Sequence, residues 1–394
     1  MGQFHNEHEP LGGRLLSKTT LICAILAFIA VVLLAKRMVF GLGSVTNLNN
    51  GYPWGLWIVY DVVIGTAFAC GGYAMAVLTY IVNKGEYHPL VRPALLASCF
   101  GYTLGGISIV FDLGRWWNAW HILVPGYMQP NSVMFEVALC VMTYILVLWV
   151  EFSPAILSRL GLTRLRRKLD KVLFLFIALG VLLPSMHQSS LGTLLVVMGY
   201  QIHPLWQTPI LPLLFLASAV TMGFSIVVFE ALLGSAGFRR SVRHEIPQLG
   251  KLANIVRAMM AVYLVVRFGD LAVRGELGAI FTSGVKSVMF VIEIALFATP
   301  VALFSSPERR ASRKFLWIGA CCLLLAGALY RLDAFLVAYM TGPGWQYFPS
   351  VQELLVTIGI IAAEVLLYIV FVHTFPVFYT HKLSPAELAA ASPK

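Results

Sequence analysis

Five ionisable side chains of this chain lie in long apolar stretches or directly beside one. They are two aspartates, a glutamate, an arginine and a histidine, at Asp61, Asp112, Glu136, Arg115 and His187. Carboxyl groups and the imidazole ring can exchange protons with a bound substrate near neutral pH. An ionisable group at the centre of a bilayer costs at least about 2.5 kcal/mol unless it is paired or hydrated. These five residues are therefore candidates for a function that uses their charge.

The composition indicates a membrane protein. Of the 394 residues, 59% are hydrophobic and 12% are charged, with a mean hydropathy of +0.82, whereas soluble domains carry about 25% charged residues. A transmembrane helix needs roughly 20 apolar residues, and such runs are present at 17–38, 56–82, 92–112, 131–151, 171–197, 209–235, 251–273, 284–304, 314–340 and 352–376. The sequence therefore predicts an all-α polytopic membrane protein with about ten transmembrane helices.

The basic residues are distributed as membrane topology signals are. A net charge of +10 could suggest nucleic-acid binding, but the lysines and arginines cluster in short loops between the apolar runs. With a cytoplasmic N-terminus, 20 of the 28 lysines and arginines lie on the cytoplasmic side and 5 on the other side. This asymmetry predicts a multi-pass protein of the bacterial inner membrane with both termini in the cytoplasm.

The candidate residues are expected at one depth of the membrane. At a rise of about 1.5 Å per residue, His187 lies roughly 24 Å along its helix from the cytoplasmic side. Asp61 and Glu136 lie roughly 8 Å below the outer surface. Asp112 and Arg115 close the outer end of the third apolar run. Four consecutive helices therefore place these groups in one slab near the periplasmic face.

Each of these residues also has a purely structural interpretation. Asp112 and Arg115 have the i, i+3 spacing of a helix ion pair and could neutralise one another. Asp61 and Glu136 could cap or hydrogen-bond neighbouring helices. His187 could satisfy backbone groups freed by the proline that precedes it in LPSMHQSS.

The chemistry that fits such a slab is quinone/quinol exchange. A quinone is apolar, but each of its two oxygens takes up a proton as electrons arrive, so its site needs apolar walls and a few proton donors. We expect His187 and Asp112 to hold the quinone, Arg115 to tune Asp112, and Asp61 or Glu136 to relay protons. The candidate quinone contacts are His187, Asp112, Gln188 and Trp116.

Resident metal centres are not expected. All six cysteines fall inside apolar runs without C-x-x-C spacing, which argues against an iron–sulfur cluster or a zinc site. Only His187 and His373 lie within the runs, and they lie at different depths, so two histidines would not meet at one haem iron. The sequence therefore predicts no haem and no iron–sulfur cluster bound by this chain.

Two short patterns recur along the chain and predict an internal repeat. Ser132-Val133-Met134-Phe135 returns at Ser287-Val288-Met289-Phe290, 155 residues later, and Asp112-Leu113 returns at Asp270-Leu271, 158 residues later. An even number of spans separates the copies, so the halves would be parallel repeats. The predicted segments are a cytoplasmic tail (1–16), the first helix and its outer loop (17–55), a four-helix bundle with the quinone site (56–208), a second four-helix bundle (209–340), the last helix (341–376) and a cytoplasmic tail (377–394).

The second half and the last helix carry further charges within the apolar runs. They are Arg267, Asp270, Glu293, Arg331, Asp333 and Glu364. Such a set could form a proton route, or only internal ion pairs left by the duplication.

Several long segments resemble a known family. FGLGSVTNLNNGYPWGLWIVYD (40–61), GEYHPLVRPALLASCFGYTLGGISIVFDLGRWW (85–117), LPSMHQSSLGTL (183–194) and YFPSVQELL (347–355) are similar to the NrfD/polysulfide reductase family of membrane subunits. Within it, the chain most resembles the membrane subunits of hydrogenase-2-type nickel–iron hydrogenases.

The resemblance implies a function for the whole chain. Family members carry no redox centre of their own and bind menaquinone or ubiquinone in the first four-helix bundle near the periplasmic face. They dock a ferredoxin-like iron–sulfur subunit there, and in this branch the electrons come from a large and a small hydrogenase subunit. The chain would then be the quinone-reducing subunit of a hydrogen:quinone oxidoreductase, unable to oxidise hydrogen alone, with proton uptake that is local or coupled to translocation.

Two other functions fit the same residues. The same module could serve a polysulfide, nitrite or tetrathionate reductase, which the partner subunits would distinguish. A secondary transporter is the more distant alternative, because parallel repeats and buried charges also suit ion translocation.

Overall fold

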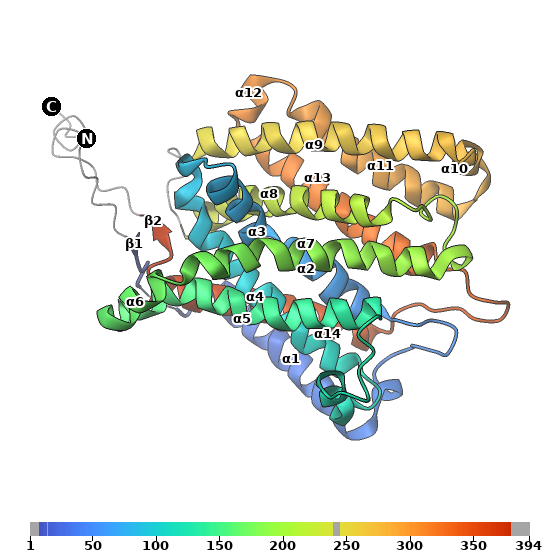
Figure 1. The fold of residues 1–394 in the computed structure, drawn as a ribbon, viewed down its shortest axis with the longest axis horizontal. Coiled ribbons are helices and arrows are strands. Elements are labelled where there is room, and N and C mark those ends of the chain that lie inside the picture. The colour runs from blue at the N-terminus through green and yellow to red at the C-terminus, as the bar shows by residue number, and fades with distance from the viewer. Residues whose placement is uncertain (1–7, 14, 239–244, 380–394) are drawn as a thin grey trace.

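The long helices of the chain lie side by side in the computed structural model, which describes residues 8–13, 15–238 and 245–379 (Figure 1). Ten helices in this part are long and apolar enough to cross a membrane. They are Lys18–Phe40, Ile58–Ile81, Gly85–Asp112, Val133–Arg159, Leu173–Gln201, Leu211–Gly237, Ile246–Val273, Val285–Leu303, Arg313–Val337 and Val351–Thr374. The predicted fold class is confirmed.

Most predicted boundaries lie within a few residues of the observed ones, and two helices are clearly longer than predicted. The third span begins at Gly85 and the fourth ends at Arg159. Pro93 and Pro154 are accommodated inside these helices. A polar helix end can extend beyond the hydrocarbon, where hydropathy no longer marks it.

The elements follow one another along the chain almost without strands. The helices are α1 (Lys18–Phe40), η1 (Leu42–Ser44), η2 (Ile58–Ile64), α2 (Gly65–Phe68), α3 (Gly71–Ala76), η3 (Val77–Ile81), η4 (Gly85–Tyr87), α4 (His88–Asp112), η5 (Trp116–Leu123), α5 (Val133–Arg159), α6 (Thr163–Asp170), α7 (Leu173–Met198), η6 (Gly199–Gln201), α8 (Leu211–Gly237), α9 (Ile246–Val273), η7 (Glu276–Gly278), α10 (Ala279–Thr282), α11 (Val285–Leu303), α12 (Pro307–Arg310), α13 (Arg313–Leu332), η8 (Asp333–Val337) and α14 (Val351–Thr374). The two-residue strands β1 (His8–Glu9) and β2 (Phe378–Tyr379) pair antiparallel.

The first and last long helices pack against each other. α1 lies along α14, and α14 also contacts α4. α5 packs on α4 and α7, while α13 contacts α8 and α11 (Figure 1). α7 packs on α8 and so joins the two halves of the chain. The division into two bundles at residue 208 and the parallel repeat remain predictions.

The second and ninth spans each contain a π-helical segment. η2 holds Asp61 and η8 begins with Asp333. A π-helical turn widens the helix and is frequent at functional sites. Both segments lie towards the same end of the molecule, here named the loop end, which also carries η5 and the chain between η8 and α14 (Figure 1).

The opposite end, here named the basic end, carries α6, α12 and the two short strands (Figure 1). α6 has the sequence TRLRRKLD and α12 has PERR. Six of the basic residues assigned to the cytoplasmic side in the topology count lie outside the described residues, namely Arg14, Arg239, Arg240, Arg243, Lys382 and Lys394. The outer parts of the two predicted tails, 1–7 and 380–394, are likewise not described.

Close packing of α1 on α14 depends on Gly359. A Cβ atom at Gly359 would lie 2.3 Å from the Cβ of Ala30 and 2.7 Å from the carbonyl oxygen of Leu26. Small residues allow helix backbones to approach closely in membranes, where packing is a main source of helix association.

Replacing Gly359 with Ala is therefore expected to destabilise the protein. Overpacking of this kind typically costs about 1–3 kcal/mol, which outweighs the intrinsic preference of a helix for Ala over Gly. The measurement is the thermal midpoint of the purified protein in detergent. Gly269→Ala is the control, because nothing lies within 4 Å of a Cβ there. Equal midpoints for the two variants would contradict the packing argument.

Candidate functional site

A large cavity lies between α14 and the helices of the rest of the molecule, beside the contact of α14 with α4. Its volume is about 910 Å³, and residues of η2, α2, α4, α8, α13 and α14 line it together with the start of the chain. The cavity extends from Asp61 to His373, which lies in the last turn of α14 at the basic end. Most lining side chains are apolar or small, and the acids among them are Asp61, Glu230 and Glu364. Sites for small molecules commonly have this volume and this mixture.

Asp61 lies at the wall of this cavity and carries an unpartnered carboxyl oxygen. The residue is only 5% exposed, and its buried Oδ2 has no hydrogen-bond partner among the described residues. Its backbone oxygen would lie 2.8 Å from a Cβ at Gly105, so this glycine allows α4 to approach η2. A buried polar atom without a partner usually marks a function or an unseen ligand.

Glu230 and Glu364 face the same cavity from two other helices. Glu230 belongs to α8 and Glu364 to α14. A Cβ at Gly101 of α4 would lie 3.3 Å from Oε1 of Glu364, so α4 packs closely there. The sequence analysis named Glu364 but missed Glu230, although Glu230 is also an acid inside an apolar run and the same rule would have found it.

His187 belongs to a separate, fully buried network. Its Nε2 lies 3.0 Å from Oγ1 of Thr66, and Gln188 donates its Nε2 hydrogen to the same oxygen at 3.1 Å. Arg331 of α13 donates from Nη2 to Oε1 of Gln188 at 3.1 Å. His187 does not line the cavity. The structure therefore brings His187 and Gln188 together with Arg331, a residue that the sequence analysis placed in a different group.

Glu136 lies close to this network on α5. It accepts a hydrogen bond of 2.8 Å from the hydroxyl of Ser190, three residues after His187 on α7. This hydrogen bond joins α5 to α7. It agrees with the structural interpretation of Glu136, in which the carboxylate bonds to a neighbouring helix.

Asp112 and Arg115 do not form the ion pair that their spacing suggested. No ion pair or hydrogen bond joins these two described residues, and Arg115 is exposed beyond the end of α4. Instead Arg37 of α1, which is buried, donates from Nε to the carbonyl oxygen of Phe111 at 2.5 Å and from Nη2 to that of Leu113. Arg37 thus satisfies the carbonyl groups at the end of α4, a common role of arginine at a helix C-terminus.

Trp116 lies in η5 at the loop end and is half-buried. Its ring meets Trp117 edge to face, with the ring centroids 5.8 Å apart. Trp117 and Trp120 are exposed on the same short helix. Trp116 therefore belongs to the aromatic cluster of η5 and does not line the cavity.

Glu353 is a connecting residue that the sequence analysis missed. Its carboxylate accepts hydrogen bonds from the backbone N–H groups of Asn47 at 3.0 Å and Ser350 at 2.7 Å, and from the hydroxyl of Tyr347 at 2.5 Å. Tyr347 in turn accepts from the N–H of Leu56 at 2.7 Å. One carboxylate therefore holds the segments 40–61 and 347–355 against each other at the loop end.

The charges of the second half fall into two sets. Asp270 forms an ion pair with Arg274 at 2.8 Å and accepts from the hydroxyl of Thr208 at 2.7 Å. This pair is half-buried and fits the interpretation as an internal ion pair.

The other charges of the second half are fully buried and only partly satisfied. Arg267 donates to the carbonyl oxygen of Leu205 at 2.9 Å, but its Nε and Nη1 have no partner. Glu293 accepts from the indole N–H of Trp206 at 2.8 Å through one oxygen only. Both carboxyl oxygens of Asp333 lack a hydrogen-bond partner. A proton route through these residues therefore stays a prediction, and their unsatisfied groups are compatible with it.

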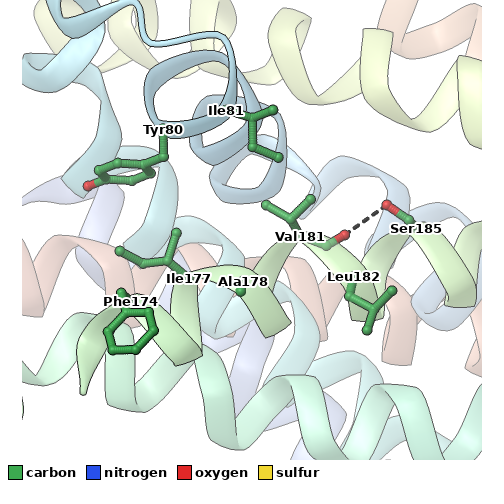
Figure 2. Close-up of a pocket in the computed structure, with 8 residues that line it drawn as sticks. All are labelled: Tyr80, Ile81, Phe174, Ile177, Ala178, Val181, Leu182 and Ser185. Carbon is green, nitrogen blue, oxygen red and sulfur yellow. Dashed lines mark hydrogen bonds between the residues drawn. The ribbon is translucent and has the colours of Figure 1, made fainter.

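A second hollow lies on the side of the first half, between η3 and α7 (Figure 2). Its volume is about 510 Å³ and its lining is almost wholly apolar. The hydroxyl of Ser185 donates to the carbonyl oxygen of Val181 at 2.7 Å (Figure 2). The hydroxyl oxygen of Tyr73 lies 2.7 Å from the hydroxyl oxygen of Ser185. Because these polar groups already have partners, the groove offers little to bind the oxygens of a quinone.

Comparison with known proteins gives consistent matches. Residues 44–341 match the family described as "Polysulphide reductase, NrfD". The chain is 47% identical over 373 residues to the "Probable Ni/Fe-hydrogenase 2 b-type cytochrome subunit" of Escherichia coli, covering 94% of this chain and 95% of that protein. It is 30% identical over 250 residues to the "Menaquinone reductase, integral membrane subunit" of Nitratidesulfovibrio vulgaris, covering 58% of this chain and 56% of that one. It is 21% identical over 423 residues to a selenate reductase subunit of Mesobacillus selenatarsenatis, covering 92% and 94%.

These matches correct the prediction that the chain binds no haem. The E. coli relative is named a b-type cytochrome subunit, and that name implies a bound haem. The prediction required two histidines at matching depth. Haem iron can instead be held by a single protein histidine, as in globins, so the absence of a matched pair was not a sufficient reason to exclude haem.

Proposed function

Because this chain belongs to the NrfD family of polysulphide reductase membrane proteins, we propose that it is the quinone-reactive subunit of a membrane-bound nickel–iron hydrogenase. The observation that carries the proposal is the cavity of about 910 Å³ with the unpartnered carboxyl of Asp61 at its wall. The name of the E. coli hydrogenase 2 subunit supports a role in a hydrogenase complex, and the name of the menaquinone reductase subunit supports reaction with a quinone.

The cavity has the chemistry that a quinone head group requires. Its apolar walls favour the ring and the isoprenoid tail, while a few polar groups fix the orientation of the oxygens. Oδ2 of Asp61 has no hydrogen-bond partner among the described residues, and the Asp61 carboxyl would donate to a quinone oxygen when protonated and accept from the hydroxyl of a quinol when ionised. Menaquinone or ubiquinone would enter between the helices and bind with its head group towards the loop end.

Protons must reach the quinone as electrons arrive. Reduction of one quinone takes two electrons and two protons and yields the quinol. Asp61 would donate a proton to the nearer quinone oxygen and then be reprotonated along the cavity, where Glu364 and Glu230 are the next acids. A positioned acid of this kind typically contributes a factor of about 10² to 10⁴ to the rate.

The remaining predicted site residues take supporting positions in this proposal. His187 acts from behind the cavity wall through Thr66, which follows Asp61 by five residues. Glu136 fixes α5 on α7 beside it through Ser190. Arg115 and Trp116, at the loop end, would face the electron donor.

The electron donor is proposed to dock at the loop end. This end would face the periplasm, since the positively charged α6 and α12 lie at the opposite end and basic segments stay in the cytoplasm. The partner would be a ferredoxin-like iron–sulfur subunit that receives electrons from the hydrogenase small and large subunits. The name of the E. coli relative supports a hydrogenase partner, and its 47% identity favours that partner over the reductase of the 21% identical relative.

A haem in this chain is inferred from the name of the E. coli relative, a b-type cytochrome subunit. Among the described histidines only His373 lines the cavity. Its Nδ1 contacts the carbonyl oxygen of Gly12, so Nε2 would be the atom of this chain that holds a haem iron. A haem, when bound, supplies one-electron transfer.

The visible spectrum of the purified complex tests the haem assignment. A difference spectrum of the dithionite-reduced against the oxidised protein is expected to show a b-type haem, and His373→Ala is expected to remove it. His203→Ala is the control, because His203 lies outside the cavity. A protein without the band, or a band unchanged in His373→Ala, would overturn the assignment.

Replacing Asp61 with Asn is expected to separate quinone reduction from hydrogen oxidation. The amide cannot donate the proton that the proposal assigns to this position, so hydrogen-to-quinone activity should fall by about 10² or more. Hydrogen-to-dye activity of the same purified complex should stay unchanged, because the dye takes its electrons before the quinone site.

The matched control is Asp170→Asn, an exposed aspartate at the end of α6. It should leave both activities at the wild-type level. Equal quinone reduction by the Asp61 and Asp170 variants would remove Asp61 from the mechanism.

A further inference from the structure

Four polar side chains form a hydrogen-bonded group with almost no exposure to solvent. Thr66, Gln188 and Arg331 are each 0% exposed and His187 is 1% exposed. They come from α2, α7 and α13, so the group joins the two halves of the chain. Because donors and acceptors are limited here and no bulk water is near, the distances determine where each proton lies.

The arginine fixes the orientation of the glutamine amide. A guanidinium group only donates hydrogen bonds, so the atom of Gln188 that lies 3.1 Å from Nη2 of Arg331 must be the carbonyl oxygen. The amide nitrogen then faces Thr66 and donates to its Oγ1 at 3.1 Å. Arg331 is itself held by the hydroxyl of Ser218 at 3.2 Å and the carbonyl oxygen of Phe215 at 3.3 Å.

The threonine hydroxyl has one hydrogen to donate, and it is already used. Oγ1 of Thr66 lies 2.6 Å from the carbonyl oxygen of Val62, which can only accept. The hydroxyl therefore donates to Val62 and has only its lone pairs left for Gln188 and His187. The ring nitrogen Nε2 of His187, 3.0 Å from Oγ1, must then carry the hydrogen of that contact.

We infer that Thr66, Gln188 and Arg331 are positioning residues that hold His187 as its neutral Nε2–H tautomer. The other ring nitrogen, Nδ1, is buried and has no hydrogen-bond partner among the described residues, so nothing there accepts a second ring hydrogen. A role of this ring in quinone reduction rests on the proposed function, whereas the tautomer itself does not.

Nitrogen NMR of the histidine ring reads the tautomer directly. The whole protein, labelled with ¹⁵N-histidine and reconstituted in lipid, should show a protonated Nε2 and an unprotonated Nδ1 for the signal that disappears in His187→Phe. A protonated Nδ1 in the wild type would overturn the inference without any further variant.

Two substitutions at Thr66 test the cause of the tautomer. Thr66→Val keeps the shape but removes the acceptor, so the His187 signal should shift or split between tautomers. Thr66→Ser restores the hydroxyl and should restore the wild-type signal. Thr299→Val is the control, since the hydroxyl of Thr299 bonds only the carbonyl oxygen of Ala295. An unchanged His187 signal in Thr66→Val would contradict the positioning role.

Enzyme kinetics separate this inference from the proposed function. If both hold, Thr66→Val lowers the kcat for quinone reduction by about tenfold, as expected for one lost interaction near the reacting group, while Thr66→Ser and hydrogen-to-dye activity stay at the wild-type level. A changed tautomer with unchanged quinone kinetics would support the positioning role and reject the quinone role of His187.

Discussion

The structure depends on one constraint, which is that a polar side chain inside the membrane must find its partners within the protein or in a cavity that the protein encloses. Arg331 meets this requirement at its two terminal nitrogens with contacts to Gln188, Ser218 and Phe215, while its Nε has no hydrogen-bond partner among the described residues. Arg37 meets it at the end of α4. Asp61 differs, because it lines the cavity and its buried Oδ2 has no hydrogen-bond partner among the described residues.

The spans could be predicted because length and hydropathy set them almost alone. The arrangement of side chains around each helix could not, since depth along a helix says nothing of the direction in which a side chain points. Asp61 and Thr66 lie on the same continuous span, yet one faces the cavity and the other faces His187. The predicted slab therefore contains two sites, and only the structure shows which residue belongs to each.

Predictions from short sequence spacing failed where a residue far away in the sequence makes the contact. Asp112 and Arg115 have the spacing of an ion pair, but the chain turns after Asp112 and Arg115 is left exposed. Arg37, 74 residues from Phe111 in the sequence, is buried against the end of α4. Glu353 and its capping of α14 also escaped notice, because its other partner, Asn47, is 306 residues away.

The central claim is that quinone binds in the cavity beside Asp61, and photo-crosslinking tests it most directly. A photoreactive quinone analogue added to the purified complex should attach to peptides around Asp61 on η2, Gly101 on α4 and Glu364 on α14, and native quinone should suppress the labelling. Labelling confined to the groove at Tyr80 and Phe174, or labelling that native quinone does not suppress, would contradict the claim.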